Sequence, residues 1–180
     1  MEYVPCLKIA QNDVKALINL EDHRKAKVSP LVEMRGKEND PHLKTFLDEW
    51  GDTSFFFDFS LTESATNTDP WFSNLLLQND EFKAKRDFLS VLSSHSNLIP
   101  VISWQEQDTL RNVTQFALRV EESFSEIAIR INMQDEKAWS TATAVLSAVR
   151  EPENITIILD YQDSPPNPNV ALKVIDEIKT

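Results

Sequence analysis

Residues 55–59 read Phe-Phe-Phe-Asp-Phe, and residues 127–131 read Ile-Ala-Ile-Arg-Ile. Runs rich in aromatic and β-branched residues predict β-strands. Four further runs of similar composition lie at residues 4–9, 29–34, 99–104 and 157–161. Parallel strands that are buried on both faces are almost wholly apolar. A polar residue that recurs late in every run therefore indicates one shared polar mouth, at the end of the sheet where the strands finish.

Helical patterns fill the gaps between these runs, so the chain alternates strand and helix. We expect strands over 3–9, 28–34, 54–60, 98–104, 126–133 and 154–161. We expect helices over 12–18, 41–50, 70–94, 108–123, 135–150 and 168–179, the third of them with a break near residues 79–80. Strict alternation implies a parallel sheet with right-handed crossovers. The predicted fold class is therefore α/β, with successive βα units.

A partial (β/α) barrel, related to the TIM barrel, fits this chain better than a nucleotide-binding open sheet. Such sheets carry clustered glycines at the first strand-to-helix turn, whereas the two glycines here, Gly36 and Gly51, lie in no such motif. Six βα units are two short of a complete eight-stranded barrel. We expect residues 1–180 to form a single domain, either the N-terminal part of a longer barrel or a shortened relative of one.

The residues two positions before each polar residue support the barrel. Because side chains alternate in facing along a strand, they should share the facing of the polar residues and form the layer beneath them. They are all apolar or a thiol, namely Cys6, Leu31, Phe56, Val101, Ala128 and Ile158. This composition predicts a packed floor under the polar mouth.

The composition of the chain limits which binding partners and which cellular compartment we expect. The formal net charge of −11 argues against a nucleic-acid partner, since phosphate backbones are bound by basic patches. A single cysteine, Cys6, gives no disulfide framework, and its place in the first strand predicts a buried, unreactive thiol. Neither a secretory signal nor a membrane-spanning run is visible. We expect a cytoplasmic protein without membrane contact.

The predicted mouth contains charged residues of both signs. Lys8, Glu33, Asp58, Arg130 and Asp160 are candidate catalytic residues if the protein is an enzyme, and the candidate ligand-binding residues beside them are Ser103, Trp104 and Asn132. The carboxylates of Glu33, Asp58 and Asp160 could hold a divalent metal ion such as Mg²⁺, because hard cations prefer oxygen ligands. Lys8 and Arg130 would then suit a substrate phosphate or carboxylate. Alternatively, one carboxylate could act as a general base.

An ion-pair network is the alternative that we favour for the same residues. Buried charges must be paired. Lys8 and Arg130 could be neutralised by Asp58 and Asp160, with no ligand involved. Both interpretations place these side chains close together and differ only in function.

Three stretches resemble the beta family proteins of bacteriophages and bacteria. The opening residues 3–12 are similar to the start of these proteins, residues 28–34 match a Pro-Leu-x-Glu strand, and residues 55–60 correspond to a strand ending in Leu-Asp-hydrophobic-Ser. The strand at 98–101 also agrees. The resemblance implies a barrel-like α/β fold and a link with conflict between phage and host. It implies no chemistry, and its motifs include only Lys8, Glu33 and Asp58. Its members are roughly twice as long as this chain.

Two functional hypotheses follow. The first is a non-catalytic binding or interaction protein, phage- or defence-associated, whose acidic surface and open sheet edges contact a protein partner or a second copy. The second is a barrel enzyme, a metal-assisted hydrolase or lyase acting on a phosphorylated or carboxylated small molecule. We favour the first, because the mouth lacks histidine, a reactive cysteine and glycine-rich loops.

Overall fold

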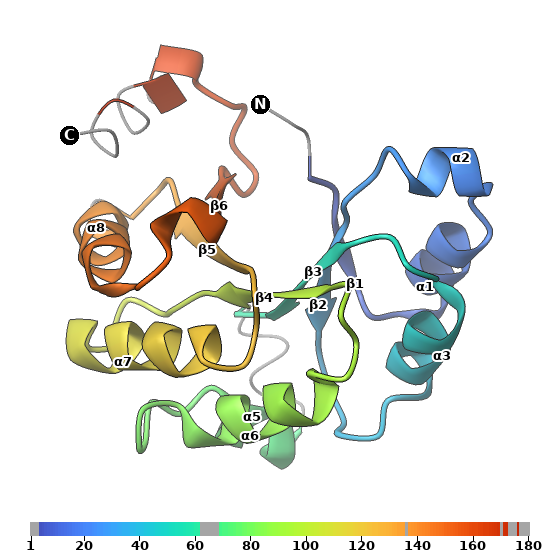
Figure 1. Ribbon diagram of the computed structural model, residues 1–180, viewed down its shortest axis with the longest axis horizontal. Coiled ribbons are helices and arrows are strands. Elements are labelled where there is room, and N and C mark those ends of the chain that lie inside the picture. The colour runs from blue at the N-terminus through green and yellow to red at the C-terminus, as the bar shows by residue number, and fades with distance from the viewer. Residues whose placement is uncertain (1–3, 62–68, 136, 170, 173–175, 177–180) are drawn as a thin grey trace.

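A curled, six-stranded parallel sheet forms the centre of the described structure (Figure 1). The computed structural model describes residues 4–61, 69–135, 137–169, 171, 172 and 176. The strands lie side by side in sequence order. They are β1 (Cys6–Lys8), β2 (Leu31–Met34), β3 (Phe55–Phe59), β4 (Leu98–Ile102), β5 (Ile127–Asn132) and β6 (Ile155–Asp160). This arrangement confirms the predicted α/β half-barrel of alternating strands and helices.

The helices cover the outer, convex face of the curled sheet (Figure 1). They are α1 (Gln11–Ile18), α2 (Asp22–Lys25), α3 (Pro41–Glu49), α5 (Pro70–Leu75), α6 (Lys83–Leu92), α7 (Leu110–Glu121) and α8 (Ala138–Ala148), with the short 3₁₀ helix η1 (Pro152–Asn154) before β6. None of the helices in the described part of the chain is both long and apolar enough to span a membrane.

Local sequence explains where α3 and α5 begin. The carboxylate of Asp40 accepts hydrogen bonds from the backbone N–H groups of His42 and Leu43, and Asp69 accepts one from Trp71. A proline follows each aspartate at the first helical turn, where its missing N–H costs nothing. Gly51 then follows α3 with a φ of +88°, a conformation that glycine adopts without strain.

Two predicted segments differ from the structure in their bounds. The helix expected over 70–94 is two helices, α5 and α6, separated by a turn in which Asp80, Glu81 and Phe82 all have positive φ; the expected break near 79–80 is confirmed. The strand expected over 3–9 is limited to residues 6–8 among those that the structure describes, where it pairs with β2. Most of the helix expected over 168–179 lies outside the described residues.

Two apolar layers hold the sheet. The larger one lies between the sheet and the helices and contains most of the buried aromatic residues. The smaller one lies on the concave face and consists of Leu31, Phe56, Ile99, Val101 and Ala128, with Val4 and Ile158 packed against it. The predicted floor is thus confirmed for every member except Cys6, which is exposed.

The register of the strands shifts along the sheet. Lys8, Glu33 and Asp58 are direct neighbours across β1, β2 and β3. Phe57 pairs with Pro100, so Ser103 lies two residues beyond the row of Asp58. Asn132 pairs with Asp160, which places Asp160 two residues beyond the row of Arg130. Because strands tilt in a barrel, side chains at one height are staggered in register. The late polar residues therefore meet in space although they occupy three different rows.

Candidate functional site

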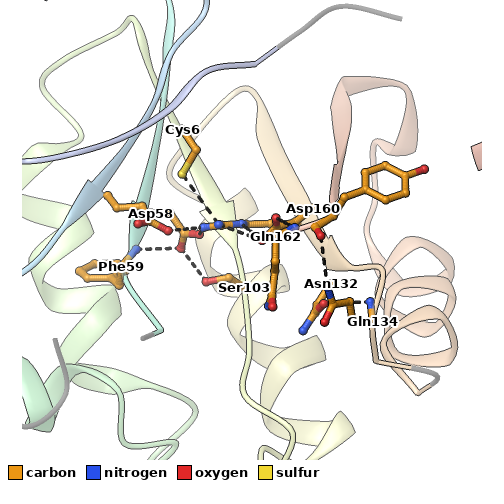
Figure 2. Close-up of polar contacts among 11 residues, drawn as sticks. Cys6, Asp58, Phe59, Ser103, Asn132, Gln134, Asp160 and Gln162 are labelled. Carbon is orange, nitrogen blue, oxygen red and sulfur yellow. Dashed lines mark hydrogen bonds and ion pairs between the residues drawn. The ribbon is translucent and has the colours of Figure 1, made fainter. Parts of the chain in front are cut away.

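Arg130, on β5, lies at the centre of the polar cluster. Its Nη1 atom is 2.7 Å from Oε1 of Glu33 and 2.9 Å from Oδ2 of Asp58. Its Nε and Nη2 atoms are 3.0 and 2.9 Å from Oδ2 of Asp160. All three guanidinium nitrogens thus face a carboxylate. Figure 2 shows Cys6, Asp58 and Asp160, from three strands, converging on this point.

Asp58 is the most deeply buried member, with no exposed surface. Its Oδ1 atom accepts hydrogen bonds from the hydroxyl of Ser103 at 2.6 Å and from the backbone N–H of Phe59 at 2.7 Å, while Oδ2 faces Arg130. Both oxygens therefore have partners, as a buried carboxylate requires. The carboxylate is fixed by β3, β4 and β5 together.

The charges around Arg130 outweigh the effect of its burial. Burial alone would lower the pKa of the guanidinium, but the negative charges of Asp58 and Glu33 raise the pKa above its ordinary range. Arg130 is therefore a permanent cation held by three carboxylates. The prediction that it neutralises Asp58 and Asp160 is confirmed, and Glu33 is a third partner that the ion-pair hypothesis did not include.

Lys8 does not join this network. Its side chain is half-buried, and no carboxylate of the described residues forms an ion pair with it. The expectation that Asp58 or Asp160 would pair with Lys8 is wrong, because Arg130 occupies both. Lys8 instead lines the open space above the cluster.

The exposure of Cys6 also differs from the prediction. It is exposed rather than buried, because β1 has a neighbouring strand on one side only within the described part of the chain. Its Sγ atom lies 3.8 Å from Nη2 of Arg130. Desolvation by the surrounding strands, together with the negative charge of Glu33, raises the pKa of the thiol to about 12. The thiol is therefore accessible but protonated, so the prediction of low reactivity remains while its reason changes.

A cavity of about 1140 Å³ opens above the cluster at the carboxyl ends of the strands. Of the predicted mouth residues, the cavity is lined by Lys8, Glu33, Ser103, Trp104, Arg130, Asn132 and Asp160, and Asp58 lies beneath it. The structure therefore brings together all eight candidate site residues. Whether any of them acts on a ligand is a separate question.

Loop residues complete the cavity wall and were not predicted. They follow β3, β4, β5 and β6 and include Leu61, Gln105, Glu106, Gln134, Asp135, Lys137, Gln162 and Asp163. Two of these loops are fixed by strand-end side chains, since Asn132 accepts a hydrogen bond from the N–H of Gln134 and Asp160 from that of Gln162. Their position immediately after a strand was the sequence signal that could have identified them.

The three candidate metal ligands surround a cation that the protein itself supplies. Glu33, Asp58 and Asp160 converge on Arg130, so the guanidinium stands where a metal ion would have to be. Among the residues that the structure describes, no group of three or more His, Cys, Asp or Glu side chains is arranged to hold a metal ion. The donor set therefore fits an ion-pair network better than a Mg²⁺ site.

A second buried cation, Lys85, lies outside the mouth and was also not predicted. It is 1% exposed, and its Nζ atom lies 5.5, 5.0 and 5.7 Å from the ring centres of Phe59, Phe82 and Phe116. Burial lowers the pKa of Lys85, although Asp58 and Asp108 oppose the shift. Lys85 is in phase with the buried Leu89 and Leu92 on α6, a helical spacing that could have revealed its burial.

Comparison with known proteins assigns the chain to a family. The model of the Beta protein family matches residues 3–178. The chain belongs to the Beta protein family. Protein beta of Enterobacteria phage P4 is 25% identical over 158 residues, which cover 88% of this chain and 44% of the phage protein. The chain thus spans less than half the length of this relative. No solved structure matches it.

Proposed function

We propose that this member of the Beta protein family is a non-catalytic binding protein that holds a partner over the cavity at the carboxyl ends of its strands. The main support is the commitment of Arg130, whose three guanidinium nitrogens all face carboxylates. A guanidinium in this state cannot also form the bidentate contact with a substrate phosphate that the enzyme hypothesis requires. The network holds the mouth in shape and leaves the loops to make contacts.

The contacts of the carboxylates also favour a non-catalytic role. A general base needs an oxygen that is free to accept a proton from the substrate. Both oxygens of Asp58 accept hydrogen bonds within the protein, and so do both oxygens of Asp160. Neither carboxylate therefore has an oxygen free to serve as a general base for a substrate.

A metal-assisted hydrolase or lyase is the second candidate. Its support is the cavity itself, which is large enough for a small molecule and lies where barrel enzymes carry their active sites. Melting temperatures with Mg²⁺, Mn²⁺ and Ca²⁺, each with and without phosphate compounds, test it. The enzyme hypothesis requires a clear stabilisation that Asp160→Asn removes, whereas the binding hypothesis expects the metal ions to leave the melting temperature unchanged.

A protein partner fits the charge of the chain, which is −11 overall. Since a relative is a phage protein, we propose that the partner comes from a phage or its bacterial host. Strands β1 and β6 each pair on one side only within the described residues, so self-association through these edges is a further route to a complex.

Capture of partners from lysates of phage-infected bacteria tests the proposal with a matched pair of variants. Asp163→Arg reverses an exposed charge at the cavity, and Glu153→Arg reverses an exposed charge at the opposite end of β6. We expect the first variant to lose a partner that the wild type and the second variant both retain. Equal loss in both variants, or in neither, contradicts binding at the mouth.

A further inference from the structure

A groove between α6 and α7 contains a buried donor without an acceptor. The two helices lie side by side on the outer face of the sheet (Figure 1), and a cavity of about 310 Å³ lies between them toward their carboxyl ends. Arg86 lines this groove, and its Nε atom is buried without a hydrogen-bond partner in the described part of the chain. A buried donor that lacks an acceptor has a desolvation cost. The groove therefore has room for an acceptor that the described residues do not supply.

Arg119 is a second cation of the same groove. Its side chain is 48% exposed, and its nitrogens lie 3.9 Å from a carboxylate oxygen of Glu81 and 3.5 Å from one of Glu122. Both distances exceed that of an ordinary hydrogen bond. The guanidinium of Arg130, in contrast, has carboxylate oxygens within 3.0 Å of all three nitrogens. Arg119 therefore has donors available for an anion, which Arg130 does not.

A turn before α6 brings the two arginines to the same level of the groove. Asp80, Glu81 and Phe82 have φ values of +48°, +58° and +57°, a conformation that is costly for residues other than glycine. The carbonyl oxygen of Asp80 accepts a hydrogen bond from Nη2 of Arg86 at 2.7 Å, and the next residue, Glu81, forms the ion pair with Arg119. Consecutive residues of one turn thus each contact one guanidinium. The two arginines are therefore close together, one on each helix.

The carboxylates that line the groove have cations of their own. Asp87 forms an ion pair with Lys83, and Oε1 of Glu122 accepts a hydrogen bond from Arg150 at 3.2 Å. Neither Lys83 nor Arg150 lines the groove. The groove residues and their ion-pair partners together carry four cations and three carboxylates, namely Arg86, Arg119, Lys83 and Arg150 against Asp87, Glu122 and Glu81. Although the whole chain is acidic, this groove therefore favours an anion.

We propose that the groove between α6 and α7 binds a phosphate group between the guanidinium groups of Arg86 and Arg119. The site goes beyond the proposed function, because it shares no lining residue with the cavity at the mouth. The phosphate group could belong to a small phosphorylated molecule or to a phosphorylated side chain of a protein partner. A small rotation of Arg86 brings Nε to a bound oxygen, since among the described residues only the carbonyl of Asp80 holds its guanidinium.

The number of donors favours a phosphate over a carboxylate. One guanidinium already matches both oxygens of a carboxylate, whereas a phosphate monoester has three strong acceptor oxygens for two guanidinium groups. The hydroxyl groups of Ser90 and Ser123 line the same groove, and a hydroxyl can donate to a further oxygen. The donor set therefore suits an anion with several acceptor atoms.

Titration calorimetry at low ionic strength, in a buffer free of phosphate, tests the proposal. The probes are inorganic phosphate, glycerol 3-phosphate and Nα-acetyl-phosphoserine methylamide, with sodium acetate as the carboxylate control. We expect saturable binding of at least one phosphate probe, and binding of acetate that is weaker at least about tenfold, as the loss of one charged hydrogen bond implies. Preference for the first two probes identifies a small molecule as the ligand, whereas preference for the phosphoserine derivative identifies a protein side chain.

Variants locate the binding site. Arg119→Gln should weaken phosphate binding at least about tenfold, because it removes a charged donor group. The matched control Arg111→Gln removes an exposed arginine at the opposite end of α7 and should leave binding nearly unchanged. Asp87→Asn removes a carboxylate of the groove at the cost of a surface ion pair, which adds little stability, so it should tighten binding several-fold. Misfolding cannot cause this gain, which keeps the test valid even if a variant at Arg86 or Arg119 is less stable.

Four results would overturn the inference. These are absence of binding of every phosphate probe to the wild type, binding that survives both Arg86→Gln and Arg119→Gln, equal weakening by Arg119→Gln and Arg111→Gln, and acetate binding as tight as that of phosphate. The last two results would indicate general attraction of anions rather than a specific site. Capture of a partner at the mouth is tested separately by Asp163→Arg, so failure of the phosphate site leaves the proposed function intact.

Discussion

Arg130, whose side chain is partly exposed, and Lys85, which is fully buried, are both cations near Asp58, yet their surroundings act on them in opposite ways. Arg130 lies on the concave face among three carboxylates, which raise its pKa. Lys85 lies between α6 and the sheet among three phenyl rings, and burial lowers its pKa. The carboxylates around Arg130 stabilise its charged form, whereas the apolar surroundings of Lys85 favour its neutral form. The charges of the mouth are therefore an integral part of the fold, whereas the charge of Lys85 is one that the fold could do without.

Replacing Arg130, the cation at the centre of the mouth, should lower the free energy of unfolding more than the other substitutions below. Arg130→Met leaves three carboxylates without their common partner, which should cost about 4 kcal/mol of unfolding free energy. Urea denaturation at pH 7 measures the loss. The control Arg150→Met removes a guanidinium whose side chain is 68% exposed and should cost under about 1 kcal/mol. Equal losses in the two variants would show that the network adds nothing beyond a surface ion pair.

Ser103→Ala should have the second-largest effect. It removes the 2.6 Å hydrogen bond to the fully buried Asp58, and hydrogen bonds to charged groups contribute about 2 kcal/mol. The exposed Ser147, which donates to the carbonyl of Thr143, gives a matched control that should lose under about 0.5 kcal/mol on substitution by alanine. Differential scanning calorimetry compares the two. A Ser103 variant no less stable than the Ser147 variant would contradict the importance of this contact.

Lys85→Met should be neutral or stabilising by about 1 kcal/mol near pH 7, because an apolar side chain replaces a buried charge. The difference should shrink as the pH approaches the ordinary lysine value of 10.5. In that window the unfolded state still binds a proton that folded Lys85 has released, so the wild type gains stability relative to the variant as the pH rises. Cys6, whose pKa is raised from 9.0 to about 12 in the folded protein, also titrates in this window, but it is present in both proteins, so its contribution cancels from the difference. Parallel stability curves for the two proteins would refute the lowered pKa.

The smallest expected change concerns reactivity rather than stability. Burial and Glu33 raise the pKa of the exposed Cys6 thiol from 9.0 to about 12. Since the thiolate is the reactive form, Cys6 should react with a disulfide reagent at pH 8 at least about tenfold more slowly than in the urea-unfolded chain. A folded protein that reacts as fast as the unfolded chain would show that burial and the negative charge of Glu33 do not raise the pKa of the Cys6 thiol.

The sequence allowed the mouth to be predicted but not its internal pairing. Composition and strand parity were enough to place Glu33, Asp58 and Arg130 on one face, because side-chain alternation in a strand depends on nothing else. Which cation neutralises the carboxylates depends on strand register and reach. Both come from tertiary packing, so Arg130 and Lys8 could not be told apart. The exposure of Cys6 was missed for a related reason, since an edge strand and a central strand have the same sequence pattern.

The staggered register of the sheet has a consequence for insertions and deletions. The rows of Asp58, Arg130 and Asp160 are separated by steps of two residues. Deleting two residues from the loop before β4 could slide that strand by one full pleat and leave the facing of Ser103 unchanged. Deleting a single residue would instead turn Ser103 away from Asp58, because a one-residue slip reverses every side chain of a strand. The spacing of this site is therefore encoded in the lengths of the segments between strands as much as in the residues that line it.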